Sequence, residues 1–402
     1  MTASLLSTVE MAPRDPILGI TEAFQADPNP KKVNLGVGVY TDEHGKIPLL
    51  ECVRTAEHSL EAIPRPRGYL PIEGLTTYLR SVQELVFGTD SEVVAQGRVV
   101  TVQSLGGTGG LKIGADFLKR VTPSSEVWIS DPSWENHRSL FEAAGFTVRT
   151  YPYYDAGTRG VNFEGLCAAF DSAPTGTILV LHACCHNPSG VDLTDSQWTE
   201  VMTLIRRKQL VPFLDLAYQG FSSGVEKDAE VVRRFATLDI PVLVSNSFSK
   251  SFSLYGERVG ALSLLTSSRD ESQRVLSQLK RVIRTNYSNP PIHGAEVVAT
   301  VLSSPPLKTM WAQELGAMRD RIKSMRHEFV ARLKSRLPGH DFSFVNHQNG
   351  MFSFSGLTTP QVHRLKNEFS VYAVDTGRIC VAALNTRNLD TVVEAIAQIV
   401  GQ

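Results

Sequence analysis

Several short polar clusters in the middle of the chain contain residue types that bind anions or attack carbonyl groups. The first is Gly106-Gly107-Thr108-Gly109, which opens a helical pattern. Backbone N–H groups at a helix N-terminus, together with the Thr108 hydroxyl, suit a phosphate group. The glycines equally suit a tight structural turn. Because the motif has neither the lysine of a Walker loop nor the spaced glycines of a dinucleotide loop, both interpretations stay open.

A second cluster, Ser247-Phe248-Ser249-Lys250, follows an apolar run. The hydroxyls of Ser247 and Ser249, with the guanidinium of Arg258, are groups that bind phosphate well. Most lysines are solvated surface residues, and this is the simplest interpretation of Lys250. At a strand end beside anion-binding groups, however, its amine also suits a Schiff base with a carbonyl compound.

A carboxylate, Asp215, lies within the otherwise mainly apolar segment 212–218. Burying an unpaired carboxylate is costly, so Asp215 needs a cation or hydrogen-bond donors. A helix cap or an internal ion pair would meet that need. The more specific hypothesis is that Asp215 holds the protonated ring nitrogen of a pyridoxal phosphate cofactor, a pairing typical of enzymes that use it. His137 in a nearby helical segment is placed to orient the carboxylate.

These clusters follow short β-branched segments that alternate with helical patterns. Such alternation predicts a mainly parallel sheet covered by helices on both faces. Ligands bind at the carboxyl ends of the strands in such sheets, so we expect the clusters to line one pocket. The expected strands are 98–102, 126–130, 147–151, 177–182, 211–216 and 241–245, and the expected helices are 111–120, 134–144, 195–207, 228–236, 271–284 and 311–336.

Six motifs in order along the chain resemble those of the aspartate/aromatic aminotransferase family. They are NLGVGVY (34–40), HNPSG (186–190), DLAYQGF (215–221), SFSK (247–250), NYSNPP (286–291) and QNGMFS (348–353). Members of this family are fold-type I pyridoxal-phosphate enzymes. The resemblance implies an α/β protein whose large domain has a mainly parallel seven-stranded sheet. A smaller α/β domain would come from both chain ends.

The resemblance also implies domain boundaries. Residues 1–14 would form an N-terminal arm that contacts a partner subunit. Residues 15–47 together with 316–402 would form the small domain, and residues 48–315 the large cofactor-binding domain. The expected assembly is a homodimer whose two active sites are shared between the subunits.

The roles that the resemblance assigns around the cofactor begin with Lys250, which would form the Schiff base and move a proton. Asp215 would hold the pyridine nitrogen, with His137 behind it. Tyr218 and Asn187 would bind the phenolic oxygen, and Trp134 would stack on the ring. The phosphate-binding residues would be Gly107, Thr108, Ser247, Ser249 and Arg258, with Tyr69 reaching in from the second subunit.

The substrate site implied by the resemblance centres on Arg378, which would bind the α-carboxylate in a bidentate pair. Asn187 and the Gly38 backbone would assist, with Trp134 beside them. Arg284 from the second subunit would face the side-chain carboxylate of a dicarboxylic substrate. We expect aromatic amino acids or aspartate as amino donors and 2-oxoglutarate as acceptor. The alternatives are an aspartate aminotransferase restricted to dicarboxylates and, more remotely, a pyridoxal-phosphate lyase or a non-catalytic binding protein.

Composition excludes some partners. The chain has 402 residues, with 40 Lys+Arg against 41 Asp+Glu. Nucleic-acid binding needs an excess of basic charge, so no nucleic-acid partner is expected. No apolar run approaches the ~20 residues that span a bilayer, so no membrane association is expected.

Cysteine usage and the N-terminal sequence indicate a compartment. Five cysteines make a poor disulfide framework, and residues 1–16 lack the basic start and apolar run of a secretory signal. We therefore expect a cytoplasmic protein. The segment 182–186 contains two histidines and two cysteines, but adjacent strand residues point to opposite faces and the spacing does not suit zinc. No metal is expected.

Overall fold

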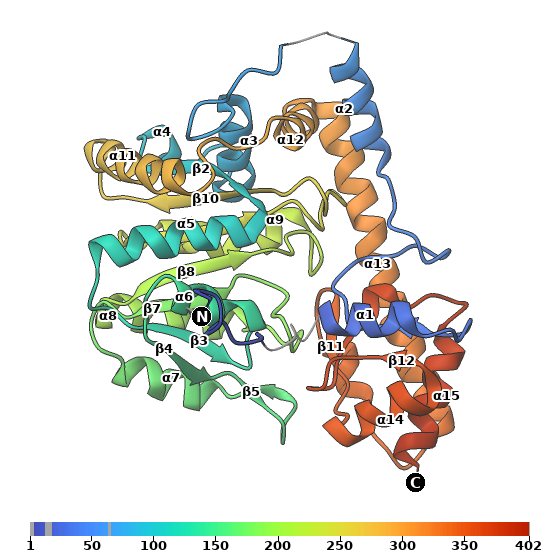
Figure 1. Cartoon of the computed structure of the whole chain (residues 1–402). Helices are drawn as coiled ribbons and strands as arrows, with labels where there is room; N and C mark the ends of the chain where they lie inside the picture. Colours follow the sequence, from blue (N-terminus) through green and yellow to red (C-terminus); the bar gives the residue numbers. More distant parts are fainter. Residues whose placement is uncertain (1–3, 13–17, 63–65, 402) are drawn as a thin grey trace.

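The computed structural model describes residues 4–12, 18–62 and 66–401 (Figure 1). Its largest sheet has seven strands. Its strand order is β2-β10-β9-β8-β7-β3-β4, and every strand except β10 runs in the same direction. The α/β fold class with a mainly parallel seven-stranded sheet is thereby confirmed. The strands are β2 (Val99–Leu105), β3 (Val127–Asp131), β4 (Val148–Pro152), β7 (Ile178–His182), β8 (Val211–Leu216), β9 (Val242–Ser247) and β10 (Val259–Leu265).

Helices cover both faces of this sheet because the central strands are apolar on both sides. In β8, for example, Phe213 packs into one hydrophobic cluster and Leu214 into the other. The first cluster contains α5 (Gly106–Val121), α6 (Glu135–Ala143) and α11 (Arg269–Asn286). The second contains α3 (Thr76–Phe87), α7 (Phe163–Ser172), α8 (Asp195–Lys208), α10 (Glu230–Ala236) and α12 (His293–Ser303).

Segments from the N-terminal and C-terminal parts of the chain pair with one another beside the sheet. Strand β1 (Val33–Asn34) pairs in parallel with β12 (Val371–Tyr372), and β11 (Phe352–Phe354) pairs with β13 (Arg378–Cys380) in antiparallel fashion. Figure 1 shows these strands beside α1, with the long helix α13 running past them. The helices of this region are α1 (Leu18–Ala26), α13 (Pro305–Arg336), α14 (Thr359–Phe369) and α15 (Leu389–Val400).

The remaining elements are short or lie at the edges. They are α2 (Glu51–Glu61), α4 (Glu92–Ala95), α9 (Val225–Asp228), the hairpin of β5 (Tyr154–Asp155) and β6 (Gly160–Val161), and the 3₁₀ turns η1 (Ser343–His347) and η2 (Val381–Ala383). The division into 15–47 plus 316–402 and 48–315 stays a prediction. Its first boundary, and residues 1–3 and 13–14 of the expected arm, lie outside the described residues.

Three of the expected helices differ from the observed ones by more than two residues or are divided. Helix α5 begins at Gly106, five residues before the expected start, because its glycines continue the helix that we placed from Leu111 onward. Helix α13 begins at Pro305, since proline is tolerated in the first helical turn. The expected helix 228–236 is divided at Ala229 into α9 and α10.

Within the described residues, no helix combines the length and the apolar character needed to cross a bilayer.

Candidate active site

A pocket of about 250 Å³ opens at the carboxyl ends of the parallel strands. Residues that follow β2, β3 and β9, and residues at or just beyond the ends of β7 and β8, all reach it, as the strand order predicts. The predicted site residues that line it are Gly38, Gly107, Thr108, Trp134, Asn187, Asp215, Tyr218, Ser247, Ser249, Lys250, Arg258 and Arg378.

One end of the pocket is formed by the first turn of α5. Gly106 has φ +67°, and a Cβ there would lie 2.5 Å from Arg258 Nη2. The Gly106 N–H donates to the Arg258 carbonyl (2.9 Å), and the Ser245 hydroxyl donates to the Gly107 carbonyl (2.9 Å). No acidic side chain lies in this first helical turn. The turn therefore presents backbone donors and the positive end of the helix dipole to the pocket.

Arg258 lies beside this turn and has no carboxylate partner among the described residues. Its Nη1 donates to the Ser249 hydroxyl (3.3 Å) and to the Tyr255 carbonyl (2.8 Å). Ser247 Oγ accepts from the Ser249 N–H (3.2 Å). A guanidinium without a protein counter-ion, two hydroxyls and a helix N-terminus together make a site suited to a phosphate dianion.

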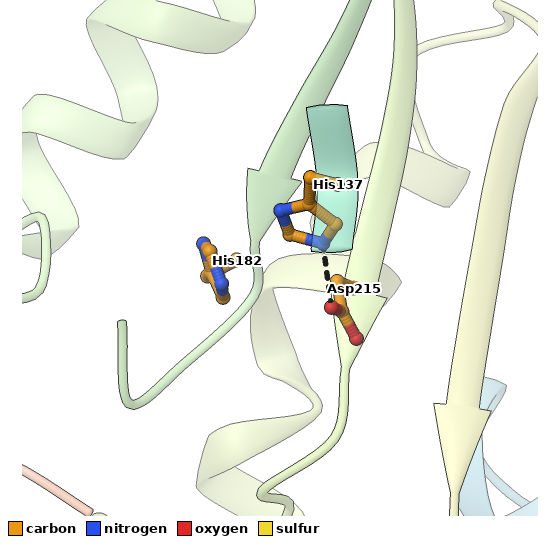
Figure 2. A group of neighbouring side chains, drawn as sticks. All are labelled: His137, His182 and Asp215. Atoms are coloured by element: carbon orange, nitrogen blue, oxygen red, sulfur yellow. Dashed lines mark hydrogen bonds and ion pairs between the residues drawn. The ribbon is translucent and has the colours of Figure 1, made fainter. Parts of the chain in front are cut away.

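A carboxylate lies deeper in the pocket. Asp215 Oδ2 is 3.0 Å from His137 Nε2 (Figure 2). His137 Nδ1 is 2.8 Å from Ser133 Oγ. Burial alone would raise the pKa of Asp215, but the hydrogen bond with His137 and the charge of Lys250 hold it below its ordinary value. Asp215 is therefore a buried anion, and such a group is stable only when it faces cations or donors.

His182 also lines the pocket, and the sequence analysis did not assign it. Both of its ring nitrogens are buried without a hydrogen-bond partner among the described residues, and Figure 2 shows the ring beside His137. Burial lowers the pKa of His182 to about 3, so the ring is neutral at physiological pH. His137, His182 and Asp215 are donors that a metal ion could use. A direct hydrogen bond already joins two of these three groups, and we assign no metal to them.

Lys250 lies in the turn that follows β9, with its Nζ 4.9 Å from the centre of the Tyr218 ring. Burial lowers the pKa of Lys250 to about 8; Asp215 opposes this shift, and Arg258 and Arg378 add to it. An amine with a lowered pKa has a larger fraction in its nucleophilic, neutral form at neutral pH.

Arg378 on β13 closes the other end of the pocket and is almost fully buried. Its Nη1 donates to Asn187 Oδ1 (3.1 Å) and its Nη2 to the Gly36 carbonyl (2.7 Å). Its Nε has no partner among the described residues, and Glu135 Oε2 lies 4.0 Å from Nη1. The guanidinium thus keeps donor capacity for an incoming carboxylate.

Three further residues shape the walls. The half-buried Trp134 ring lies edge-on to His137, with 5.3 Å between ring centres. The Phe352 ring lies 4.4 Å from Arg378 Cζ. A Cβ on Gly38 would lie 2.6 Å from the Phe352 ring, so only glycine allows this close approach. Leu111, Ala217, Tyr255 and Phe352 line the pocket but were absent from the sequence-based set.

Tyr69 and Arg284 do not reach this pocket within one chain. They line a separate surface groove, where Tyr69 is 95 % exposed and Arg284 donates to Ser288 Oγ. Asn289 Nδ2 donates to the Leu70 carbonyl (2.7 Å) in the same groove. Their expected action from a second subunit stays a prediction.

Comparison with known families gives a match over almost the whole chain. Residues 30–396 match the family described as aminotransferase class I and II. The chain belongs to this family.

Individual relatives cover nearly all of the chain. It is 62 % identical to an aspartate aminotransferase of Pseudomonas aeruginosa (98 % of this chain, 100 % of the relative). It is 50 % identical to the aromatic-amino-acid aminotransferase of Escherichia coli (96 % of this chain, 97 % of the relative). Among solved structures, an aromatic-amino-acid aminotransferase from Burkholderia pseudomallei, covalently bound to pyridoxal phosphate, has 64 % identity and a TM-score of 0.96, with 98 % of this chain and 99 % of that chain covered.

Proposed function

We propose that this aminotransferase moves the amino group of an aromatic amino acid or aspartate to 2-oxoglutarate, with pyridoxal phosphate as cofactor. The observation that supports this most is that Lys250, Asp215 and Arg378 line one pocket. An amine of lowered pKa, a buried anion and a guanidinium with unused donors are the groups that such a reaction needs.

The chemistry of the pocket lining suits pyridoxal phosphate. The first turn of α5 and Arg258 offer donors without a counter-ion, and Asp215 is a buried anion that matches a protonated ring nitrogen. When bound, this cofactor withdraws electrons from the substrate and so stabilises negative charge at the substrate Cα. The residues that would hold it are Gly107, Thr108, Trp134, Asn187, Asp215, Tyr218, Ser247, Ser249, Lys250 and Arg258.

Lys250 would move the proton in this reaction. In its neutral form, Nζ would take a proton from the substrate Cα as a general base. As an ammonium, it would then donate that proton again as a general acid, so that one side chain serves both halves of the proton transfer. The lowered pKa of Lys250 keeps part of the amine neutral at physiological pH. Asp215 keeps its negative charge throughout, and His137, itself bonded to Ser133, fixes the direction of that carboxylate.

Arg378 would orient the substrate through the α-carboxylate that every amino and oxo acid carries. Asn187 and Gly36 hold the guanidinium plane on two sides, and Phe352 covers one face. This arrangement leaves the substrate side chain to be selected elsewhere. Relatives named for aspartate and for aromatic amino acids are both close to this chain, which supports use of both substrate classes.

We further propose a homodimer in the cytoplasm. Tyr69 and Arg284 lie outside their own pocket, and so their expected roles require a second subunit. Leu5, Leu6, Val9 and Met11 are highly exposed apolar residues of the N-terminal arm and offer a surface for such a contact. The described cysteines are free thiols, as in proteins of reducing compartments.

Half-reaction kinetics test the proposal. The purified holoenzyme is mixed with aspartate, phenylalanine or tyrosine, and formation of the oxo acid is followed in single turnover. We expect turnover with all three donors, and multiple turnovers only when 2-oxoglutarate is added. Reaction with aspartate alone would support the restricted enzyme, and release of ammonia or carbon dioxide without an oxo-acid requirement would refute amino transfer.

A cofactor-attachment experiment tests the role of Lys250. After borohydride reduction, mass spectrometry of the wild-type protein should show the cofactor bound to the peptide that contains Lys250. Lys250→Ala should show no such adduct and should lose at least about 100-fold in activity. Lys227→Ala, which removes an exposed lysine, is the matched control.

A further inference from the structure

Arg326 is a buried cation that the proposed mechanism does not use. It lies in the middle of α13 and is 3 % exposed, yet no carboxylate pairs with it among residues 4–12, 18–62 and 66–401. Burial lowers the pKa of Arg326 to about 10, so the guanidinium is still charged at neutral pH. Burying a charge without an ion-pair partner is costly unless other hydrogen bonds compensate.

All the recorded hydrogen bonds of Arg326 go to one short segment. Its Nη2 donates to the carbonyls of Gly350 (2.8 Å) and Phe352 (3.3 Å), and its Nε donates to Ser353 Oγ (3.3 Å). We call residues 349–353 the wall segment. Because a planar guanidinium has its donors in a fixed arrangement, three bonds within residues 350–353 fix the backbone path of the wall segment relative to α13.

The opposite side of the wall segment is held by the loop 185–192. The Asn349 N–H donates to the Gly190 carbonyl (2.6 Å), and Asn349 Nδ2 donates to Asp192 Oδ2 (3.2 Å). Gly350 has φ +76°, and a Cβ there would lie 2.5 Å from Cys185 Cβ. The wall segment is therefore clamped between α13 and the loop that carries Asn187.

Phe352 extends from the wall segment into the active-site pocket. Its ring lies 4.4 Å from Arg378 Cζ and meets the Tyr218 ring edge-on, with 6.0 Å between ring centres. It also occupies the space that a Cβ on Gly38 would need. Attraction between a guanidinium and an aromatic face restricts where the guanidinium can lie, so the position of Phe352 helps to set the direction of the Arg378 donors.

We propose that Arg326 is a positioning residue for the substrate carboxylate. By fixing the wall segment it holds Phe352 against Arg378, and so it sets the affinity for the α-carboxylate of every amino-acid and oxo-acid substrate. The inference rests on the proposed function, because it takes Arg378 as the α-carboxylate site. The inference goes beyond the proposed function because Arg326 lies outside the pocket and should affect the binding of all substrates equally.

Two variants of the holoenzyme test this proposal. Arg326→Lys keeps the charge but loses the forked donors, and Ser353→Ala removes one acceptor. Hydrogen bonds to charged groups are strong, so we expect Arg326→Lys to raise KM for aspartate and for phenylalanine by the same factor, about tenfold. The value of kcat and the absorbance of the bound cofactor should change less than about threefold, because neither depends on carboxylate affinity. Ser353→Ala should give a smaller shift in the same direction.

Equilibrium binding gives a second measurement that a purely structural role would not change. We titrate each holoenzyme with 3-phenylpropionate, a carboxylate without an amino group. Its dissociation constant should rise in the variants by the same factor as KM. The matched control is Lys323→Met, which alters an exposed residue on the same helix.

The outcomes separate this inference from the proposed function. Variants with a lowered melting temperature but with KM and 3-phenylpropionate affinity within twofold of wild type would overturn the inference alone. A rise in KM confined to one substrate class would overturn it as well. A wild-type holoenzyme without amino-transfer activity would overturn the proposed function and this inference with it.

Discussion

The electrostatic surroundings of Lys250 and Asp215 favour a partly neutral amine beside a charged carboxylate. Burial acts on both side chains, but only Asp215 has a hydrogen-bond donor, His137, that compensates for it. Lys250 instead shares the pocket with two arginines, Arg258 and Arg378, which lower its pKa further. The two residues can therefore differ in role although they lie in the same pocket.

The lowered pKa of Lys250 predicts how the rate of cofactor attachment depends on pH. Only the neutral amine attacks an aldehyde, so lowering the pKa to about 8 moves the reactive range downward. In stopped-flow mixing of cofactor-free enzyme with pyridoxal phosphate, the rate should rise about tenfold per pH unit below pH 8 and level off above it. A rate that keeps rising to pH 10, as for an ordinary lysine, would contradict this prediction.

A second prediction for a single residue concerns Glu135. Its Oε2 lies 4.0 Å from Arg378 Nη1, where it competes with a substrate carboxylate for the guanidinium. Glu135→Gln should therefore lower KM for all substrates. Because the side chain is about one-third exposed and screened by solvent, we expect only about a two- to fourfold change. Steady-state kinetics at low and high salt measure it, and a KM that rises in the variant would contradict the competition.

At the scale of elements, the first turn of α5 joins the candidate phosphate site to the sheet. Gly106→Ala places a methyl group at φ +67° and within 2.5 Å of Arg258 Nη2. The backbone strain alone costs about 1–2 kcal/mol, and displacement of Arg258 should weaken cofactor binding. Thermal unfolding and cofactor titration measure the two effects separately.

Gly339→Ala is the control for this prediction, because a Cβ at that glycine meets no atom within 4 Å. Unchanged cofactor affinity in Gly106→Ala would show that the turn does not depend on this close approach.

The sequence predicts the parallel strands well because each is a short apolar segment bounded by polar residues. Strand β8 has the bounds that were expected, 211–216. Strand β10 is also an apolar segment but was not among the expected strands. Its antiparallel direction between β2 and β9 is set by tertiary pairing that the local pattern does not encode. The start of α5 was missed because glycines are poor helix formers, and here tertiary contacts with β9 and β10 outweigh that preference.

Pocket residues with a charge or a reactive group could be predicted from the sequence. Residues that reach the pocket only through packing could not. Lys250 and Asp215 stand out because a charge at the end of an apolar strand needs a reason. Phe352 belongs to a motif that the sequence analysis quoted, but nothing local places its ring against Arg378. His182 ends a strand, and its unpartnered ring nitrogens become evident only when the surrounding side chains are placed.

At the scale of the whole molecule, the proposed role of Arg284 makes selection of the substrate side chain depend on a second subunit. If Arg284 acts across the dimer, Arg284→Ala should reduce kcat/KM for aspartate about 10- to 100-fold, since a charge-assisted bond to the distal carboxylate is lost. Phenylalanine has no distal carboxylate and should be affected much less. Equal losses for both substrates would refute the assigned role.

Mixed dimers give a direct test of the same arrangement. Lys250→Ala and Arg284→Ala subunits are mixed under conditions that allow exchange. In each mixed dimer, one site combines an intact Lys250 with an intact Arg284 from its neighbour, so about one quarter of all sites become complete. Aspartate activity should recover accordingly. Absence of recovery in verified mixed dimers would place Arg284 in its own subunit's site.

The hydrogen bond between Arg378 and Gly36 joins residues that are 342 positions apart. Because Arg378 lies on β13, near the end of the chain, it is among the last residues to be synthesised, whereas Gly36 is among the first. A growing chain can thus complete its central sheet, with Lys250 and the first turn of α5, before any substrate-binding guanidinium exists. Under the proposed function, the cofactor-binding residues from Gly107 to Arg258 are therefore all synthesised before Arg378, the residue proposed to bind the substrate carboxylate.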